Sequence, residues 1–411
     1  MSQSLIIVGA GLAGWTTARE FRKLDTTTQL MLVTADSGDF YAKPSLSNAF
    51  AQGRLPAQLV STPAAKMAET LNVTLLAHTR VEAIDTAAQT LSVRSAAGLQ
   101  TLGYSDLVLA TGAQAIRVPV QGDAADAVMS INSRDDFAAF HAHLQAAAVA
   151  AAAPLREVLI MGAGLIGCEF ANDLAQAGMR VRVVDPGPRP LAALLPPEAS
   201  AALQAALEAL GVHFHFGCTV RAVDHAAGRL QVTLATGEVV AADAVLSAVG
   251  LRADTALAQT SGLQVDRAIV VNTFLQTSAA HIYALGDSAQ YASAPSLLSA
   301  HGSTLPYVMP IMSAARALAA TLAGTPTALA FALMPVSVKT PALPLVVAAA
   351  QTGLAGHWAA AGQGIWHWHD DAGQPRGFVL AGAQTSQRMA QAKLLSPLIL
   401  PVFAGELPRM H

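Results

Sequence analysis

The chain has 411 residues, of which 53% are hydrophobic and only 12% are charged, with a formal net charge of −3. This length predicts two to three domains, and the low charge predicts strands buried on both faces, as in parallel sheets. The absence of a basic block argues against a nucleic-acid-binding protein. No apolar stretch reaches the roughly 18 residues that a membrane-spanning helix needs, so we expect no membrane insertion.

A dinucleotide-binding fingerprint opens the chain. An apolar strand is predicted over 4–8, the turn GAGLAG follows at 9–14, and a helical pattern continues to residue 24. In this order the first glycine makes a tight turn, the second lets backbone amides approach a pyrophosphate, and the third lets the helix lie close to the strand. The next predicted strand, 29–35, ends at Asp36, where an acid accepts a hydrogen bond from a ribose hydroxyl.

The same device recurs later in the chain. A strand is predicted over 156–161, the turn GAGLIG occupies 162–167, and a helix is predicted over 168–177. The strand 180–184 then ends at Asp185. Two such motifs in context predict two dinucleotide sites. A carboxylate at Asp185 favours NADH over NADPH, because it accepts from a free 2′-hydroxyl and repels a 2′-phosphate.

Hydrophobic periodicity predicts the remaining elements. Helices are expected over 64–71, 137–153, 198–210, 307–323 and 386–395. Strands are expected over 73–77, 79–84, 90–94, 106–111, 212–216, 220–223, 230–234, 238–241, 244–249 and 281–285. From about residue 328 a further set of strands, over 333–339, 344–350, 365–369 and 376–381, indicates a separate α+β unit. The Ser/Ala/Pro-rich stretch 292–305 is interpreted as a mobile insertion.

Seven motifs in a fixed order support recognition of a family. They are GAGLAG (9–14), YAKP (41–44), ATG (110–112), GAGLIGCEFANDL (162–174), YALGD (283–287), YVMP (307–310) and KTPA (339–342). Together they resemble the FAD-dependent pyridine-nucleotide oxidoreductases, and within them the rubredoxin–NAD reductases, nearly from end to end. The chain departs from the family pattern in an alanine-rich stretch near 146–153, in the insertion, and in Ser288, where many relatives have cysteine.

The resemblance implies an α/β fold with two Rossmann-like dinucleotide-binding domains of the three-layer ββα type and a C-terminal α+β interface domain. A discontinuous FAD-binding domain is expected at 1–117 and 246–327, an NAD-binding domain at 118–245, and the C-terminal domain at 328–411. FAD is then the bound cofactor and NADH the substrate.

Site residues follow from the motifs and the likeness together. Asp287 is expected to hold FAD near its phosphates and ribityl chain, Val81 to meet the adenine edge, and Val308 to present backbone to the flavin. The candidate cofactor-binding residues are Gly9, Gly11, Leu12, Ala13, Gly14, Ala35, Asp36, Lys43, Val81, Thr111, Gly112, Gly162, Gly164, Gly167, Glu169, Asp185, Gly286, Asp287, Val308 and Lys339.

Three side chains are candidate catalytic residues. By the likeness, Lys43 and Lys339 lie near the isoalloxazine, where cations stabilise the anionic reduced flavin. Each stands near a proline in an apolar stretch, and the simpler interpretation is a surface lysine. Glu169, on the second fingerprint helix, is expected to pair with Lys43; the simpler interpretation is an acid favoured by the helix dipole.

The cysteines restrict the route by which electrons leave. Cys168 and Cys218 are the only two, they form no C-x-x-C motif, and both read as small core residues. A redox-active disulfide is therefore excluded, and electrons leave the flavin one at a time. Histidine pairs at 141/143, 213/215 and 367/369 lack the cysteine or carboxylate cluster that would complete a metal site, so none is expected. The cysteine usage and the absence of an apparent secretory signal predict a cytoplasmic protein.

The preferred hypothesis is an NADH–rubredoxin reductase that passes single electrons to rubredoxin. A flavorubredoxin reductase and a [2Fe–2S] ferredoxin reductase are alternatives among enzymes. An NADH-sensing redox flavoprotein that acts through partner binding is an alternative of another class. Fast reduction of an iron-carrying partner discriminates the enzymes from the sensor.

Overall fold

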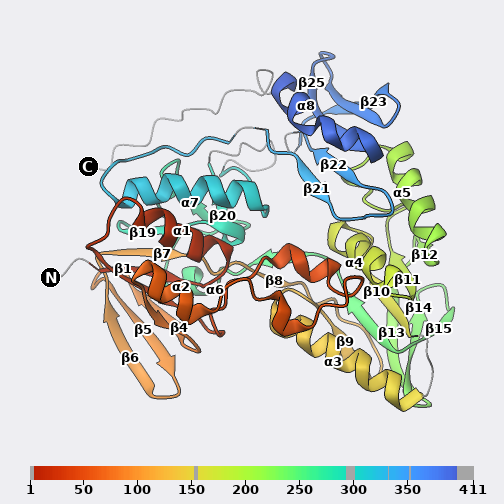
Figure 1. The fold of residues 1–411 in the computed structure, drawn as a ribbon, viewed down its shortest axis with the longest axis horizontal. Helices are drawn as coiled ribbons and strands as arrows, with labels where there is room; N and C mark the ends of the chain where they lie inside the picture. Colours follow the sequence, from red (N-terminus) through yellow and green to blue (C-terminus); the bar gives the residue numbers. More distant parts are fainter. Residues whose placement is uncertain (1–3, 152–155, 293–300, 332, 351–352, 396–411) are drawn as a thin grey trace.

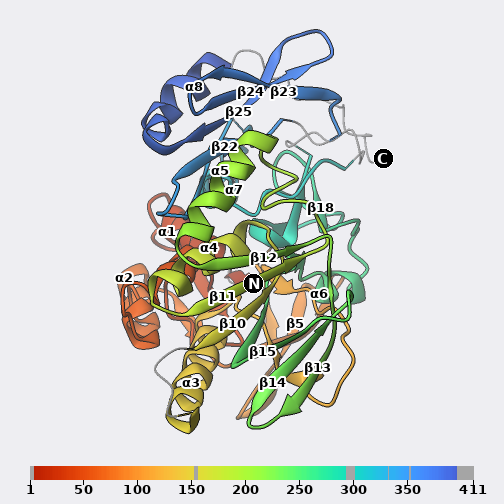
Figure 2. The ribbon, with the colours of Figure 1, turned by 90° about the vertical axis from the view of Figure 1, so that its right-hand side faces the viewer.

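The computed structural model describes residues 4–151, 156–292, 301–331, 333–350 and 353–395. Figure 1 shows two α/β units side by side, with the C-terminal unit above the second of them. Figure 2, turned by 90°, shows the same C-terminal unit at the top. In the described part of the chain no helix is long and apolar enough to cross a membrane.

The first unit is built on a five-stranded parallel sheet in the order β19-β7-β1-β2-β3. Its strands are β1 (Ser4–Val8), β2 (Gln29–Val33), β3 (Thr74–Leu76), β7 (Asp106–Leu109) and β19 (Ile282–Ala284). Every residue of β1 is buried, as expected for a strand covered on both faces. Helices α1 (Leu12–Arg22) and α7 (Val308–Leu322) contact each other above the sheet (Figure 1).

The other face of this sheet is covered by an antiparallel meander (Figure 1). The meander comprises β4 (Arg80–Asp85), β5 (Thr90–Ser95) and β6 (Gly98–Gly103). Strand β6 has no counterpart among the predicted elements, because its glycines and its mostly exposed side chains leave little apolar periodicity. The resulting layers, helices on one face and a β-meander on the other, are the predicted three-layer ββα arrangement.

The second unit repeats this design. Its parallel sheet has the order β12-β11-β10-β16-β9, beside a meander β13-β14-β15. The parallel strands are β9 (Val128–Met129), β10 (Glu157–Met161), β11 (Arg180–Asp185), β12 (Val212–Phe216) and β16 (Ala244–Ser247). The meander consists of β13 (Val220–Ala226), β14 (Arg229–Leu234) and β15 (Val239–Ala242). The helices are α3 (Arg134–Ala151), α4 (Leu165–Gln176) and α5 (Pro197–Ala209).

The chain crosses between the two units twice, and the crossings lie side by side. Strand β8 (Ala113–Ala115) pairs antiparallel with β17 (Leu251–Ala253). Strand β16 pairs with β10 along its full length, so the second sheet extends to Ser247 rather than to the boundary expected at 245. We therefore propose that the return to the first unit occurs between Ser247 and Leu251.

The C-terminal unit is a five-stranded antiparallel sheet in the order β21-β22-β25-β24-β23. Its elements are β21 (Val336–Val338), β22 (Leu345–Ala348), β23 (Gly356–Gly362), β24 (Ile365–Asp370), β25 (Pro375–Ala381), η5 (Gly382–Gln387) and α8 (Arg388–Leu395). Strand β23 was not predicted, because its sequence GHWAAAG lacks β-branched residues; pairing with β24 holds it in place. The helix expected from residue 386 begins at Arg388, after the 3₁₀ turn η5.

Short elements complete the chain. They are η1 (Lys43–Asn48), η2 (Pro56–Leu59), α2 (Ala64–Leu71), η3 (Ala125–Ala127), α6 (Ala256–Thr260), β18 (Ile269–Val271), η4 (Gly286–Ser288) and β20 (Ala289–Tyr291). Most of the insertion expected at 292–305 lies outside the described residues. At its edges, backbone groups of Tyr291 and Ser303 form a β-bridge.

Candidate functional site

The first glycine turn has the geometry that its motif predicts. Gly9 has a positive φ of 108°, and a Cβ there would lie 2.2 Å from the carbonyl oxygen of Ala110. A Cβ on Gly14 would lie 1.9 Å from the carbonyl oxygen of Gly9. Gly11 differs, since no atom lies within 4 Å of the position of its missing Cβ. Two glycines therefore make the turn possible, and the middle one leaves open space in front of the backbone.

The second glycine turn repeats these contacts. A Cβ on Gly162 would lie 2.7 Å from the carbonyl oxygen of Ala248, and one on Gly167 would lie 2.0 Å from that of Gly162. The middle glycine, Gly164, again has no neighbour within 4 Å. The open space at both middle positions is where the backbone of such a motif approaches a pyrophosphate.

An acid stands at the end of the strand beside each turn, but only Asp185 is hydrogen-bonded to its turn. Asp36 Oδ1 accepts a hydrogen bond from the backbone N–H of Gly38 (2.9 Å), and Oδ2 makes no hydrogen bond to any described residue. Both oxygens of Asp185 accept, from the N–H of Ala163 (2.6 Å) and of Gly187 (2.6 Å). Asp185 thus ties its glycine turn to its strand end, while Asp36 keeps one oxygen available for a ligand. The ribose contacts predicted for both acids stay predictions.

Three helix N-termini point their free backbone N–H groups at the expected cofactor sites. Helices α1, α4 and α7 start after Gly11, Gly164 and Tyr307, and none of these capping positions makes a side-chain cap hydrogen bond. Pro310 fits in the first turn of α7 because the N–H it lacks would have no helical partner there. Uncapped N-termini with a positive dipole end favour anionic groups.

The remaining predicted positions in this region surround the first turn. Backbone N–H of His78 donates to the carbonyl of Asp36 (2.8 Å), so the segment leading to Val81 runs beside Asp36. Thr111 Oγ1 donates to the carbonyl of Asp254 (2.8 Å), which ties the ATG segment to the second crossing. The adenine contact of Val81 and the cofactor contacts of Thr111 and Gly112 remain predictions.

Asp287 lies close to the first turn with an unsatisfied carboxylate. Its Oδ1 is buried and has no hydrogen-bond partner in the described structure. Burial raises the pKa of this carboxyl group, and the charge of Lys43 opposes that increase. The preceding Gly286 has φ of 80°, and a Cβ there would lie 2.9 Å from the Cβ of Ala13 in α1. This close approach brings Asp287 to the N-terminal turn of α1.

Glu169 forms an ion pair with Lys339, and the prediction that it pairs with Lys43 is wrong. Its Oε2 accepts hydrogen bonds from Lys339 Nζ and from Ser47 Oγ (2.7 Å), and its Oε1 accepts from the backbone N–H of Lys339 (3.0 Å). Lys339 Nζ also donates to Ser47 Oγ (2.7 Å). The C-terminal domain brings its KTPA loop onto α4, which allows both the main chain and the ammonium group of Lys339 to reach the buried carboxylate.

Lys43 is exposed and is held differently. Its Nζ donates to Asn132 Oδ1 (3.3 Å), and its charge acts on Asp287. The two candidate lysines are therefore not equivalent: Lys339 is neutralised by Glu169, and Lys43 keeps its charge near Asp287. Ser47 was missed by the sequence analysis, because a loop serine has no pattern that distinguishes it.

The cysteines have no redox partner. Cys168 and Cys218 are both free and buried, as the core interpretation predicted. Burial raises the pKa of the Cys168 thiol, which donates to the carbonyl of Ala163 (3.3 Å). Among the residues that the structure describes, no three His, Cys, Asp or Glu side chains are arranged to hold a metal ion.

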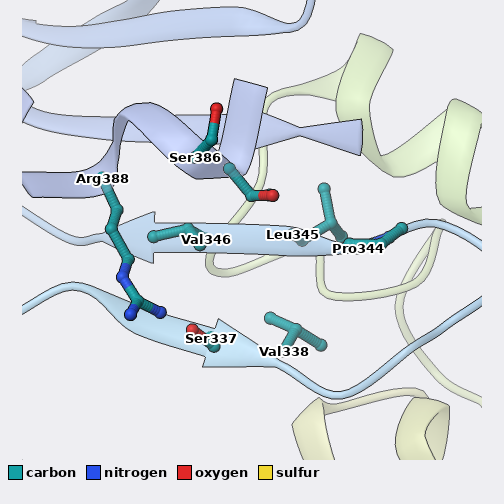
Figure 3. A pocket seen from close by; sticks show the side chains of 8 residues that line it. Ser337, Val338, Pro344, Leu345, Val346, Ser386 and Arg388 are labelled. Carbon is teal, nitrogen blue, oxygen red and sulfur yellow. The ribbon is translucent and has the colours of Figure 1, made fainter. Parts of the chain in front are cut away.

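A separate cavity of about 370 Å³ lies in the C-terminal unit (Figure 3). Its lining residues are Ser337, Val338, Pro344, Leu345, Val346, Thr385, Ser386 and Arg388. Figure 3 shows the Arg388 guanidinium reaching over β22 toward Ser337. The cavity borders β21, which ends one residue before Lys339.

Family models match most of the chain. The model described as pyridine nucleotide-disulphide oxidoreductase matches residues 3–317, and the model described as rubredoxin binding C-terminal domain matches residues 328–395. The Rubredoxin-NAD(+) reductase of Alcanivorax borkumensis is 41% identical over 403 residues, which cover 97% of this chain and 99% of that protein. The chain belongs to the rubredoxin–NAD(+) reductases.

Other rubredoxin–NAD(+) reductases and related enzymes are similar to this chain over nearly its full length. The Rubredoxin-NAD(+) reductase of Acinetobacter baylyi is 40% identical, over 96% of this chain and 98% of that protein. The Nitric oxide reductase FlRd-NAD(+) reductase of Aeromonas hydrophila is 38% identical, over 94% of this chain and 95% of that protein. The fold is shared with the reductase of a covalent putidaredoxin reductase–putidaredoxin complex, with a TM-score of 0.83 at 23% identity over 96% of this chain and 93% of that chain.

FAD and NAD(H) are the cofactors of rubredoxin–NAD(+) reductases, and the first unit fits FAD. A flavin dinucleotide would supply a hydrogen-bond partner for the unsatisfied oxygen of Asp287 and for the uncapped N-terminus of α7. It would also fill the open space in front of Gly11. Val308 and Met309, at the start of α7, are 41% and 55% exposed although both are large and apolar. A flavin ring would cover such side chains.

Tyr291 supports the Asp287 loop of this rubredoxin–NAD(+) reductase, and the sequence analysis missed it. Its buried hydroxyl accepts from the N–H of Gly286 (2.7 Å) and donates to the carbonyl of the same residue (3.2 Å). Its ring packs edge-on against Phe331, 5.3 Å away. Gly286 has no side chain of its own to hold it, so Tyr291 orients the residue that precedes Asp287.

Tyr291→Phe should weaken FAD binding without removing the ring. Without the hydroxyl, the free loop can turn the Gly286 N–H toward another partner, and restoring the conformation that binds FAD then costs part of the roughly 1–3 kcal/mol of an unpaired buried N–H, or about 1.4 kcal/mol. We therefore expect the Kd for FAD to rise about tenfold. Fluorescence titration of the apoprotein with FAD measures this change. Tyr283→Phe, on β19 in the same sheet, is the control and should bind FAD as the wild type does. An unchanged Kd in Tyr291→Phe would show that the hydroxyl has no role in orienting the loop.

Proposed function

We propose that this protein is an NADH:rubredoxin oxidoreductase, in which FAD occupies the first unit and NADH binds to the second. The single observation that supports this most strongly is the buried ion pair of Glu169 and Lys339, which joins the second glycine-turn helix to the C-terminal rubredoxin-binding domain. One NADH and two oxidised rubredoxins then yield NAD⁺, a proton and two reduced rubredoxins. Bound FAD supplies the conversion of one hydride into two single electrons.

The residues of the chain place charge around that cofactor. With FAD bound, the N–H groups at the start of α1 would hold its phosphates, and Asp287 Oδ1 would accept from one of its hydroxyl groups. The N-terminus of α7 and the ammonium group of Lys43 would stabilise the negative charge that a bound flavin acquires on reduction. Lys339, neutralised by Glu169, orients the loop from the C-terminal domain.

The second unit supports NADH as the electron donor. The N-terminus of α4 would hold its pyrophosphate, and Asp185 would accept from a hydroxyl of the adenosine ribose. Strand β11 carries two arginines. Arg180 lies at the end opposite Asp185 and pairs with Glu157 (3.5 Å), and the charge of Arg182 helps to lower the pKa of the same Glu157 carboxyl group, so we assign neither arginine to a 2′-phosphate. We therefore propose NADH rather than NADPH, and we place the reaction in the cytoplasm, where free buried thiols such as Cys168 persist.

Stopped-flow mixing of the NADH-reduced holoenzyme with separate carriers tests the acceptor. We expect rubredoxin to be reduced at least about tenfold faster than a [2Fe–2S] ferredoxin, a difference of about 1.4 kcal/mol in the barrier. The rubredoxin domain of a flavorubredoxin is the third acceptor tested. It is included because the Aeromonas hydrophila relative, which is 38% identical to this chain, is named an FlRd-NAD(+) reductase.

Each outcome has a defined consequence. A faster reaction with the flavorubredoxin domain would transfer the assignment to that acceptor, and a faster reaction with ferredoxin would overturn it. Reduction of no carrier beyond the rate with oxygen would favour the NADH-sensing flavoprotein. NADPH in place of NADH, at matched concentration, should reduce the enzyme much more slowly.

A further inference from the structure

Helix α4 carries three polar side chains on its buried side. Residues 167–174 of the helix are all buried, although Glu169, Asn172 and Asp173 are polar. Burying such groups is costly unless each finds hydrogen-bond partners. Because the residues are three and four positions apart, they lie on one face of the helix.

Asp173 contacts the segment that follows the Lys43 loop. Its Oδ2 accepts from the backbone N–H of Phe50 (3.0 Å), and its Oδ1 accepts from that of Ala51 (2.8 Å). The side chain is almost fully buried, with 2% exposed. Burial raises the pKa of this carboxyl group, and the two N–H groups and the charge of Lys339 counteract the increase. The chain between Lys43 and Ala51 is thus held at its far end by a residue of α4.

Asn172 and Glu169 contact the KTPA loop in the same way. Asn172 Oδ1 accepts from the backbone N–H of Ala342 (3.0 Å), and Glu169 Oε1 accepts from that of Lys339 (3.0 Å). One face of α4 therefore holds two loops through main-chain amides. These loops carry Lys43 and Lys339, and the first turn of the same helix is the proposed binding site for the pyrophosphate of NADH.

We propose that Asp173, assisted by Asn172, is a positioning residue for hydride transfer. Asp173 sets the loop of Lys43, and Asn172 sets the loop of Lys339, relative to the helix proposed to bind NADH. The inference rests on the proposed binding of FAD and NADH. Displacement of reacting groups by about 1 Å can lower a rate by about a hundredfold, so a residue outside the reacting pair affects the rate through geometry alone.

The test uses the Asp173→Asn holoenzyme in anaerobic stopped-flow reduction by NADH. An asparagine can accept from only one of the Phe50 and Ala51 N–H groups through its single oxygen, and its NH₂ group then faces the other N–H. We expect the limiting rate of flavin reduction to fall about tenfold or more. The Kd for NADH, obtained from the concentration dependence, and the FAD content should stay within about twofold. A purely structural role would not separate these two parameters.

Asp85→Asn is the matched control. Asp85 Oδ1 also accepts two backbone N–H groups, from Ala87 (3.0 Å) and Ala88 (2.8 Å), but on the exposed β4–β5 turn. This variant should reduce at the wild-type rate. A wild-type limiting rate in Asp173→Asn would overturn the positioning role.

A second variant keeps the test informative if Asp173→Asn does not fold. If Asp173→Asn does not retain FAD, Asn172→Ala, which lacks only the bond to Ala342, is measured in the same way. An unchanged limiting rate in that variant would then overturn the inference. Failure of NADH to reduce the wild-type holoenzyme would instead refute the proposed function, so the two failures are distinguishable.

Discussion

Asp287→Ala is expected to purify with almost no bound FAD. The wild-type carboxylate is buried without a partner at Oδ1, and a charge-assisted hydrogen bond from FAD would satisfy it. Loss of about 3 kcal/mol of binding energy raises the Kd for FAD about a hundredfold. The ratio of absorbance at 450 nm to that at 280 nm, followed by titration of the apoprotein with FAD, measures the effect. Reduction of any acceptor by NADH should be lost in parallel.

The stability of the apoprotein distinguishes a binding role from a structural one. A buried carboxylate without a partner destabilises the protein that contains it, so the Asp287→Ala apoprotein should melt no lower than the wild-type apoprotein. Asp106→Ala is the control, because Asp106 begins β7 at the opposite end of the same sheet. That variant should retain FAD. A yellow Asp287→Ala protein with wild-type FAD affinity would refute the assignment of this carboxylate to the cofactor.

Gly164→Ala is expected to raise the KM for NADH at least about tenfold while the flavin spectrum stays unchanged. The residue has an extended backbone with a φ of −76°, and no atom lies within 4 Å of the added methyl group, so the chain folds as before. The methyl group instead occupies the space through which the backbone approaches a pyrophosphate. Steady-state reduction of ferricyanide, a small acceptor, measures the KM without involving a protein partner.

Two other glycines make this experiment specific. Gly103→Ala, at the end of β6, also meets no atom within 4 Å and should leave the KM unchanged. Gly167→Ala places a methyl group 2.0 Å from the carbonyl oxygen of Gly162, so this variant should lose stability as well as NADH binding. A wild-type KM in Gly164→Ala would show that NADH does not pass over this turn.

The local features of both glycine turns could be predicted from the sequence. Gly9 and Gly162 need positive φ, and Gly14 and Gly167 need contact with a carbonyl one turn away; these are requirements within about six residues of chain. The alternation of apolar runs and turns likewise predicted the longer parallel strands, whose ends agree with the structure to within a few residues, but it missed the two-residue strand β9.

Contacts between distant segments were predicted less well. The pairing of Glu169 with Lys43 was a reasonable expectation, because both belong to motifs of the family, but the structure pairs Glu169 with Lys339, 170 positions away. Strand β23 escaped prediction because its register depends on β24 rather than on its own residues. In each case the deciding interaction is supplied by a partner that sequence spacing does not reveal.

By itself the sequence determined the fold class, the two dinucleotide turns, the acids at their strand ends and the absence of a redox-active disulfide, because these depend on residue type and short spacing. Only the tertiary structure decided which lysine neutralises Glu169, which carboxylate remains unsatisfied, and which backbone segments Asp173 and Tyr291 hold. Asp173 and Tyr291 contact backbone amides. Every residue except proline offers the same amide, so such contacts leave no pattern in the sequence and arise only when the domains fold together.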